Sequence, residues 1–255
     1  MKAIKMTAVP AILCVTLFSC GNNDNTSQNS NNINIDAITN STSKDPNAKG
    51  DNKCLLEYAD KYDQLLTEAM VLQASGFSKE KMKVKYSKVL KNNAHHSVNY
   101  NFDNGRKQLR LGLSTPMVLP DNISLNSIKA MSLKMFEDSY RAMTAEEQQH
   151  YEAAKKEVLA GNSQEANDAI KNANVDKKTL EKGVEKLDGV FSKVANAYQT
   201  VNQLGDAARW NTVTNEMVVL QNGVQFVLVV NISGDNTRNR AVANDLATTI
   251  LNKCK

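Results

Sequence analysis

The chain has 255 residues, a formal net charge of +4 and a hydrophobic fraction of 41%. Its length and hydrophobic content allow one sizeable core, in one or two domains. So weak a charge excess does not indicate nucleic acid as a partner, and we expect none to bind.

The N-terminus has the pattern of a secretory signal peptide. Two lysines precede an apolar run from Met6 to Phe18, which is too short for a membrane-spanning helix of about 20 residues. The segment Leu17-Phe18-Ser19-Cys20 resembles a bacterial lipoprotein signal. The resemblance implies that residues 1–19 are removed and that Cys20 becomes a lipid-modified N-terminus. The alternative is an ordinary signal peptide with Cys20 at the cleavage site.

The resemblance also implies a location and an anchor. Stable anchoring needs more than one acyl chain, and the lipoprotein modification carries two or three. We therefore expect a membrane-anchored protein of the cell envelope. Gly21 after Cys20 favours the outer membrane, with the periplasmic and surface faces both open. Losing residues 1–19 lowers the net charge to about +2, because they contain two lysines and no acidic residue.

Two cysteines remain in the exported chain once Cys14 leaves with the signal and Cys20 carries lipid. Cys54 stands at the start of the folded part, and Cys254 is next to the last residue. An even pair in an oxidising compartment predicts a disulfide between them. Two independent buried thiols are the alternative.

Residues 20–53 are rich in Asn, Ser, Thr and Asp and have no apolar periodicity. Such a segment buries too little apolar surface to offset its ordering entropy. We interpret it as a disordered tether with an average reach of about 30 Å. Residues 54–254 then form a single domain.

Helical spacing of apolar residues predicts a helix from Cys54 that ends at Gly76, and a second, basic helix over residues 79–90. Alternating residues on both sides of Asn104-Gly105 predict a hairpin over residues 98–113. A further helix over residues 128–136 has Asn122 or Ser124 as its cap.

Thr144 and Glu147 form a capping box that starts a helix to about Ala160. We interpret residues 144–178 as a helical insertion. A heptad pattern over residues 180–201 then predicts a long helix. Its apolar seam indicates either a partner helix from a second chain or an internal core helix.

The C-terminal part predicts a second hairpin over residues 217–232, with Asn222-Gly223 at its turn and a second strand that is apolar on both faces and hence central. Residues 235–237 cap a final helix. Its predicted inward row is Val242, Leu246, Ile250 and Cys254. Together the elements predict an α+β fold, a mainly antiparallel sheet built from two Asn-Gly hairpins with packed helices, and a possible degenerate duplication of 54–141 and 179–254.

Three stretches resemble uncharacterised bacterial cell-envelope lipoproteins: Leu65-Leu66-Thr67-Glu68-Ala69 in an opening helix, Gly205-Asp206-Ala207-Ala208-Arg209-Trp210, and the hairpin at 217–232. The resemblance implies fold and location but no activity. Within the loop, we expect Gly205 to adopt a backbone conformation closed to other residues and Asp206 to accept backbone hydrogen bonds. We expect Trp210 to fill the core, with a ligand-facing indole as the alternative.

Catalytic and metal-binding patterns are weak. Adjacent His95 and His96 in a strand point to opposite faces, and with His150 they are the only histidines. We predict no catalytic residues, no metal site and no cofactor, because no nucleophile elbow or nucleotide-binding loop is present. A row of lysines is either a solvated helix face or a surface for lipid headgroups, acidic glycans or acidic polymers. Its members are Lys79, Lys81, Lys83, Lys85, Lys88 and Lys91.

The sequence therefore favours a lipid-anchored envelope protein that binds a ligand or partner without catalysis. The alternative is a structural or assembly lipoprotein that docks onto a membrane complex through the helices of residues 144–204. A hydrolase is the third hypothesis.

Overall fold

The computed structural model describes residues 47–88, 92–108, 115–162, 167, 190 and 193–254. The chain divides into two compact units, one from residues 1–33 and 143–187 and one from residues 34–142 and 188–255. The signal, Cys20 and the tether as far as residue 46 lie outside the described residues. In the first unit the structure describes helix α6, Ala145–Ala160.

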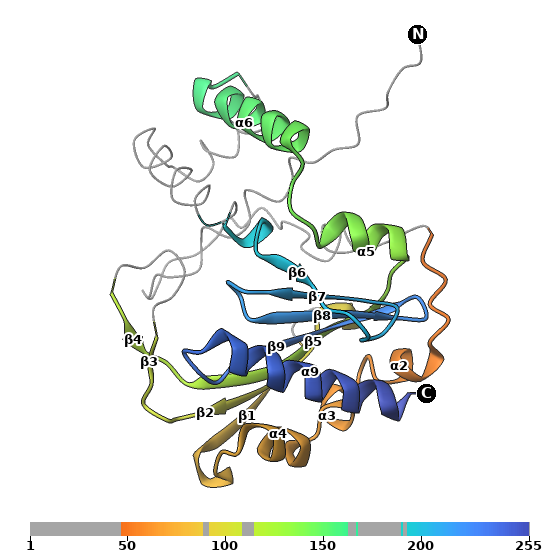
Figure 1. Ribbon diagram of the computed structural model, residues 1–255, viewed down its shortest axis with the longest axis vertical. Helices are drawn as coiled ribbons and strands as arrows, with labels where there is room; N and C mark the ends of the chain where they lie inside the picture. Colours follow the sequence, from red (N-terminus) through yellow and green to blue (C-terminus); the bar gives the residue numbers. More distant parts are fainter. Residues whose placement is uncertain are drawn as a thin grey trace, which may run out of the picture. The chain divides into compact units, whose positions relative to one another are not determined.

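A seven-stranded sheet forms the centre of the second unit, in the order β1-β2-β5-β9-β8-β7-β6. All neighbouring strands are antiparallel, which confirms the predicted α+β fold with an antiparallel sheet (Figure 1). Its strands are β1 (Met82–Ser87), β2 (Ser97–Phe102), β5 (Asp121–Ala130), β6 (Tyr198–Thr200), β7 (Ala207–Asn211), β8 (Glu216–Gln221) and β9 (Val224–Asn231). A separate two-stranded sheet pairs β3 (Lys107–Gln108) with β4 (Met117–Val118).

One face of the sheet carries the main core. Helix α9 (Asn236–Lys253) packs on β8 and β9, and α4 (Glu68–Ser75) packs beside α9. Strand β9 lies between β5 and β8, as predicted for a central strand. Its alternate residues are fully or almost fully buried in this core: Val224, Phe226, Leu228 and Val230.

The opposite face is covered differently. Helix α5 (Leu133–Ser139) inserts Phe136 against Val218 and Leu220 of β8 in a second, smaller apolar cluster. The rest of this face is largely polar, and the whole face opposite the main core is called the polar face below. On β2 and β5 it presents residues Ser97, Asn99, Asn101, Asn122, Ser124 and Asn126.

The N-terminal region forms three short helices instead of the predicted single one: α2 (Lys53–Glu57), α3 (Tyr62–Leu65) and α4. Local hydrogen bonding interrupts the apolar periodicity, because extended Leu66 is followed by Thr67, whose side chain accepts from the Met70 N–H and starts a new helix. Gly76 ends α4 in a left-handed conformation, as predicted.

The predicted basic helix over 79–90 is wrong. A short 3₁₀ turn (Lys79–Lys81) leads into edge strand β1, which pairs with β2. Tertiary pairing overrides the helical tendency of the lysines, and apolar residues alternate with lysines along the strand, at a period of two. The predicted helix start at Asn122 or Ser124 is also wrong. Both residues lie inside β5, and α5 is capped by Ser132.

The two Asn-Gly turns have different outcomes. Asn222 (φ 47°) and Gly223 (φ 70°) join β8 to β9 in a tight hairpin, which confirms the second one. The first hairpin is wrong, since β2 pairs with β1 and β5 and not with the segment that follows Asn104-Gly105. Leu109, Leu111 and Leu113 lie outside the described residues.

The insertion and the heptad pattern are only partly described. Thr144 and Glu147 form the predicted reciprocal capping bonds, and α6 extends to Ala160. Most of residues 163–192 lie outside the described part. The C-terminal end of the heptad pattern is wrong, because Tyr198 belongs to strand β6.

The predicted repeat does not extend to the helices. The helix after β5 packs on the polar face, whereas the helix after β9 packs on the core face. A duplication would relate the antiparallel strands β5 and β9 by a two-fold axis perpendicular to the sheet. Such an axis keeps both helices on the same face, so the two helices are not equivalent.

Candidate functional site

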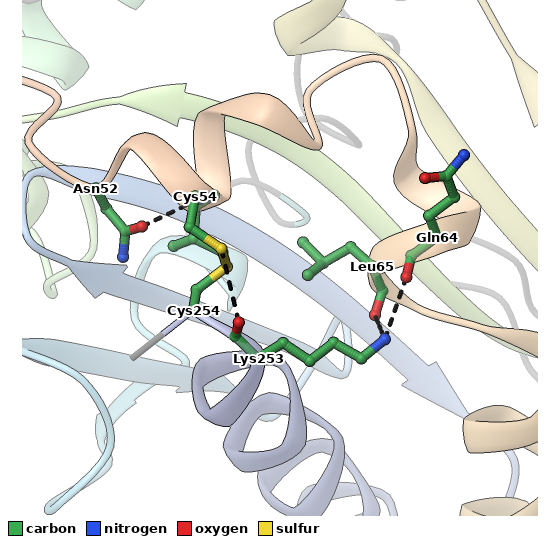
Figure 2. Close-up of a disulfide and its surroundings, with 7 residues drawn as sticks. Asn52, Cys54, Gln64, Leu65, Lys253 and Cys254 are labelled. Carbon is green, nitrogen blue, oxygen red and sulfur yellow. Dashed lines mark hydrogen bonds between the residues drawn. A yellow bond between two sulfur atoms is a disulfide. The ribbon is translucent and has the colours of Figure 1, made fainter.

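A disulfide joins the two ends of the folded unit, as predicted: Cys54 in α2 is bonded to Cys254 after α9. Figure 2 shows Lys253 beside it, with its Nζ donating to the carbonyl oxygens of Gln64 (3.1 Å) and Leu65 (2.9 Å). Burial lowers the pKa of Lys253. The C-terminus is therefore held to the N-terminal helices by one covalent bond and two hydrogen bonds.

The first described residues attach at the same end of the sheet. The Asn52 N–H donates to the carbonyl of Asn222 in the β8–β9 turn (2.9 Å), and the Asn52 side chain caps α2. The Met131 N–H donates to Gly223 in the same turn (3.0 Å). The N-terminal segment thus enters the fold beside the β8–β9 turn and the C-terminus of α9.

The predicted loop before β7 also contacts this turn. Gly205 has a φ of 64°, and a Cβ there would lie 2.5 Å from the Leu220 carbonyl oxygen. The next residue, Asp206, donates its N–H to that oxygen (2.8 Å) and accepts from the Asn222 N–H through its carboxylate. The geometry agrees with both predicted roles, and it shows that the loop supports a turn distant in sequence.

Trp210 lies in the core, as the first of its two interpretations predicted. It has no exposed surface, and its indole N–H donates to Asn236 Oδ1 at the start of α9 (2.9 Å). The ligand-facing alternative is wrong.

A polar pocket of about 680 Å³ lies at the other end of the sheet, where α9 begins. It is formed by the ends of β2 and β9, the start of β5, the β7–β8 and β9–α9 loops, and the residues around β3. Its charged members are Arg106 and Lys107. The other lining residues are Asn99, Asn101, Gln108, Leu119, Pro120, Asn122, Thr212, Val213, Thr214, Asn215, Val229, Asn231, Ser233, Gly234, Asn236 and Asn239.

Side-chain amides hold the α9 side of the pocket in place. Asn236 donates to the Thr212 carbonyl (2.9 Å) and to Asn215 Oδ1 (2.8 Å), which ties the start of α9 to the β7–β8 loop. Asn239 accepts from the Ile232 N–H (3.2 Å) and donates to the Ser233 carbonyl. These bonds make the wall rigid, because each amide is fixed at both its donor and its acceptor end.

An arginine is held in a fixed orientation on the opposite side. Arg106 pairs through Nε with the buried carboxylate of Asp121 and donates from Nη2 to the carbonyl and the side-chain oxygen of Asn231 (3.0 and 2.9 Å). Asn231 in turn donates to Gln108 Oε1 (2.8 Å). Nη1 has no hydrogen-bond partner within the described part of the chain, and the side chain is 24% exposed.

Beyond Arg106, amides and lysines cover the polar face in register. Asn122 donates to Asn101 Oδ1 across strands (3.1 Å). On the edge strand, Lys83 is paired with Asn101 and Lys85 with Asn99. Paired residues of neighbouring strands share a face, so both lysines extend the polar face to the edge of the sheet.

A half-buried acid lies near the aromatic residues of the polar face. Burial raises the pKa of Glu216, and a hydrogen bond from Thr214 opposes the shift. Burial also raises the pKa of Tyr140 to about 12, against a hydrogen bond to Gln225 (3.1 Å). Burial therefore disfavours the charged form of Glu216, and the hydrogen bond from Thr214 partly offsets this effect.

The predicted placement of the adjacent histidines in a strand is wrong, since His95 ends a 3₁₀ turn (Asn93–His95) and His96 follows it. His96 lies 3.6 Å from Asp60, whereas exposed His150 lies beside Glu146 on α6. Across the described ranges, no group of three or more His, Cys, Asp or Glu side chains is arranged to hold a metal ion. We assign no catalytic role to any of them.

The sequence did not point to the pocket. Arg106, Asp121 and Asn231 are far apart in the chain, and the network that joins them depends on pairing between β5 and β9. One sequence feature could have indicated the polar wall of the pocket. In β2, Asn99 and Asn101 alternate with buried Val98 and Tyr100, which is typical of a strand with one polar face.

No helix in the described part of the chain is long and apolar enough to cross a membrane. Comparison with known proteins found no match to any protein-family model, any curated protein or any solved structure.

Proposed function

We propose that the protein is a lipid-anchored, non-enzymatic binding protein of the bacterial cell envelope. It binds its ligand in the polar pocket at the end of the sheet. The carrying observation is the position of that pocket. Asn236 and Asn239 line it at the start of α9, and the N-terminal segment joins the fold near the helix's other end. Helix α9 has 18 residues, which corresponds to about 27 Å.

This arrangement suits a tethered receptor. A lipid on Cys20 and a flexible segment after it would attach the domain by the end with the Cys54–Cys254 disulfide. The pocket would then lie on the membrane-distal side, open to a ligand. The resemblance to uncharacterised envelope lipoproteins supports the same location.

The chemistry of the lining supports binding. The amides of Asn99, Asn101 and Asn122 offer both donors and acceptors. The charged residues of the pocket, Arg106 and Lys107, are both basic. Such groups hold a polar ligand through many hydrogen bonds, and they do not form a nucleophile with an adjacent base.

The anchor is tested by labelling. Cells that express the full chain are grown with a radiolabelled fatty acid, and the wild type is compared with Cys20→Ala. The proposal expects label in the wild type, none in Cys20→Ala, and N-terminal peptides that begin at residue 20. An unlabelled, uncleaved wild-type chain refutes the anchor.

The binding function is tested with a matched pair of variants. Val213 lines the pocket and is 36% exposed, whereas Val84 on edge strand β1 is 37% exposed and lies outside it. A panel of polar metabolites, saccharides and peptides is screened by thermal shift against the full chain, Val213→Trp and Val84→Trp. We expect ligands whose stabilisation is lost only in Val213→Trp. Turnover in a hydrolase panel, or no ligand sensitive to Val213→Trp, refutes the function.

The assembly alternative has its own signature. If the protein docks onto a membrane complex through the helices of residues 144–204, cross-linkers on α6 capture one dominant protein neighbour in cells. That result favours assembly over ligand capture.

A further inference from the structure

Positive charge and amides share one continuous surface beside the pocket. From the edge strand inward, Lys83 pairs with Asn101, Asn101 with Asn122, and Asn122 with Asn231. This row crosses from β1 to β9, three inter-strand spacings, or about 14 Å. A ligand that follows the row is therefore longer than a single sugar or amino acid.

A second row lies beside the first. Lys85 pairs with Asn99, and Asn99 with Ser124. Lys83 and Lys85 are exposed, and neither forms an ion pair with a described residue. Two free ammonium groups thus stand at one end of the surface.

Arg106 provides the cation at the other end. Asp121 and Asn231 fix its guanidinium, so its free Nη1 is presented without the usual loss of side-chain entropy. The carboxylate of Asp121 is buried and paired with Arg106. Lys107, the residue after Arg106, is exposed and forms no ion pair with a described residue. The part of the surface between β1 and Arg106 therefore attracts negative charge, since the second row reaches an acid, Glu216, only beyond β9.

Between the cations, the surface presents amides. Each primary amide donates and accepts hydrogen bonds, as does each hydroxyl of a sugar. An extended peptide instead needs pockets for alternate side chains, and the lining is mainly polar, with Leu119, Pro120, Val213 and Val229 as its larger apolar members. These groups match a ligand that is rich in hydroxyls and carries spaced anions.

We propose that the rows from Lys83 and Lys85 to Arg106 bind an acidic oligosaccharide, with its carboxylates on the cations and its hydroxyls on the asparagines. This inference rests on the proposed binding function and names its ligand class. The ligand lies across the strands, with one end in the pocket.

The test measures binding of tetragalacturonate to the detergent-solubilised full chain by titration calorimetry. We expect saturable binding that weakens as the salt concentration rises. The double variant Lys83→Gln/Lys85→Gln should weaken it by about fivefold or more. Lys49→Gln/Lys61→Gln, which removes the same charge from exposed positions of the same unit outside the two rows, should bind like the wild type.

Two further ligands separate the alternatives. Neutral maltotetraose and a hexaglutamate peptide are titrated under the same conditions. Equal affinity for the acidic and neutral saccharides, tighter binding of hexaglutamate, or equal weakening by both double variants overturns the inference. Absence of tetragalacturonate binding also overturns it. The binding function itself is judged by the Val213→Trp screen, so the two failures are distinguishable.

Discussion

Gly205→Ala is expected to destabilise the fold far more than the same change at Gly76. Both glycines have left-handed backbones, with φ of 64° and 70°, so alanine costs about 1–2 kcal/mol at either position. The reduced entropy of the unfolded chain is also the same for both substitutions. At Gly76 an added Cβ meets nothing within 4 Å, whereas at Gly205 it lies 2.5 Å from the Leu220 carbonyl oxygen.

The close approach determines the additional cost at Gly205. To relieve the overlap, the loop must move away from β8, which breaks the bond from the Asp206 N–H to the Leu220 carbonyl (2.8 Å). Loss of this bond leaves the carbonyl of buried Leu220 without its donor, and an unsatisfied buried acceptor costs about 1–3 kcal/mol. The two contributions add, so we expect Gly205→Ala to lower the free energy of unfolding by about 2–5 kcal/mol in total.

Equilibrium urea unfolding, followed by tryptophan fluorescence, measures both variants, because Trp210 is buried in the same unit. Gly76→Ala is the matched control for the left-handed conformation. The reasoning is refuted if the two variants differ by less than about 0.5 kcal/mol.

Three further predictions concern the core and its covalent link. Replacing Cys54 and Cys254 by serine should lower the free energy of unfolding by about 2–5 kcal/mol, since the disulfide closes a loop of sequence separation 200; an unchanged urea midpoint would contradict this. Glu216→Gln should stabilise the protein at pH 7.5 but not near pH 4. Burial raises the pKa of Glu216 in the folded protein. The stability that Glu216 contributes is therefore present below its ordinary pKa and is lost as the pH rises through the raised pKa. Urea midpoints that shift equally at the two pH values would exclude this linkage. Tyr100→Phe should cost about 1–3 kcal/mol in the same assay, because the Leu66 carbonyl loses its buried hydroxyl donor at 2.6 Å, and a neutral substitution would show that water replaces it.

Local chemistry accounts for the predictions that the structure confirms. Thr144 with Glu147, Gly76, and Asn222-Gly223 act through hydrogen bonds or backbone angles within a few residues. At these positions no long-range pairing competes with the local pattern, so the sequence pattern indicates the local structure correctly. The pairing of Cys54 with Cys254 was also predictable, because the signal-peptide interpretation leaves two cysteines, which have a single way to pair.

Other segments were misread because two patterns competed. Residues 82–87 have lysines that favour a helix and an alternation of Met82, Val84 and Tyr86 that favours a strand. Pairing with β2 stabilises the strand conformation of this segment. Likewise, Asn104-Gly105 permits a tight turn, but β2 finds its partners in β1 and in β5, whose pairing starts at Asp121.

By itself, the sequence determined the α+β class, the central apolar strand β9, the capped final helix and the disulfide, because each depends on side-chain types at short spacing or on a unique pair. The tertiary structure alone decided which strands are neighbours and which helix covers which face. It also assembled the pocket, since Arg106, Asn231 and Asn236 line one cavity only when β5 pairs with β9 and α9 begins beside the end of β9. Long-range pairing of this kind depends on the packing of the whole sheet, and no local pattern encodes it.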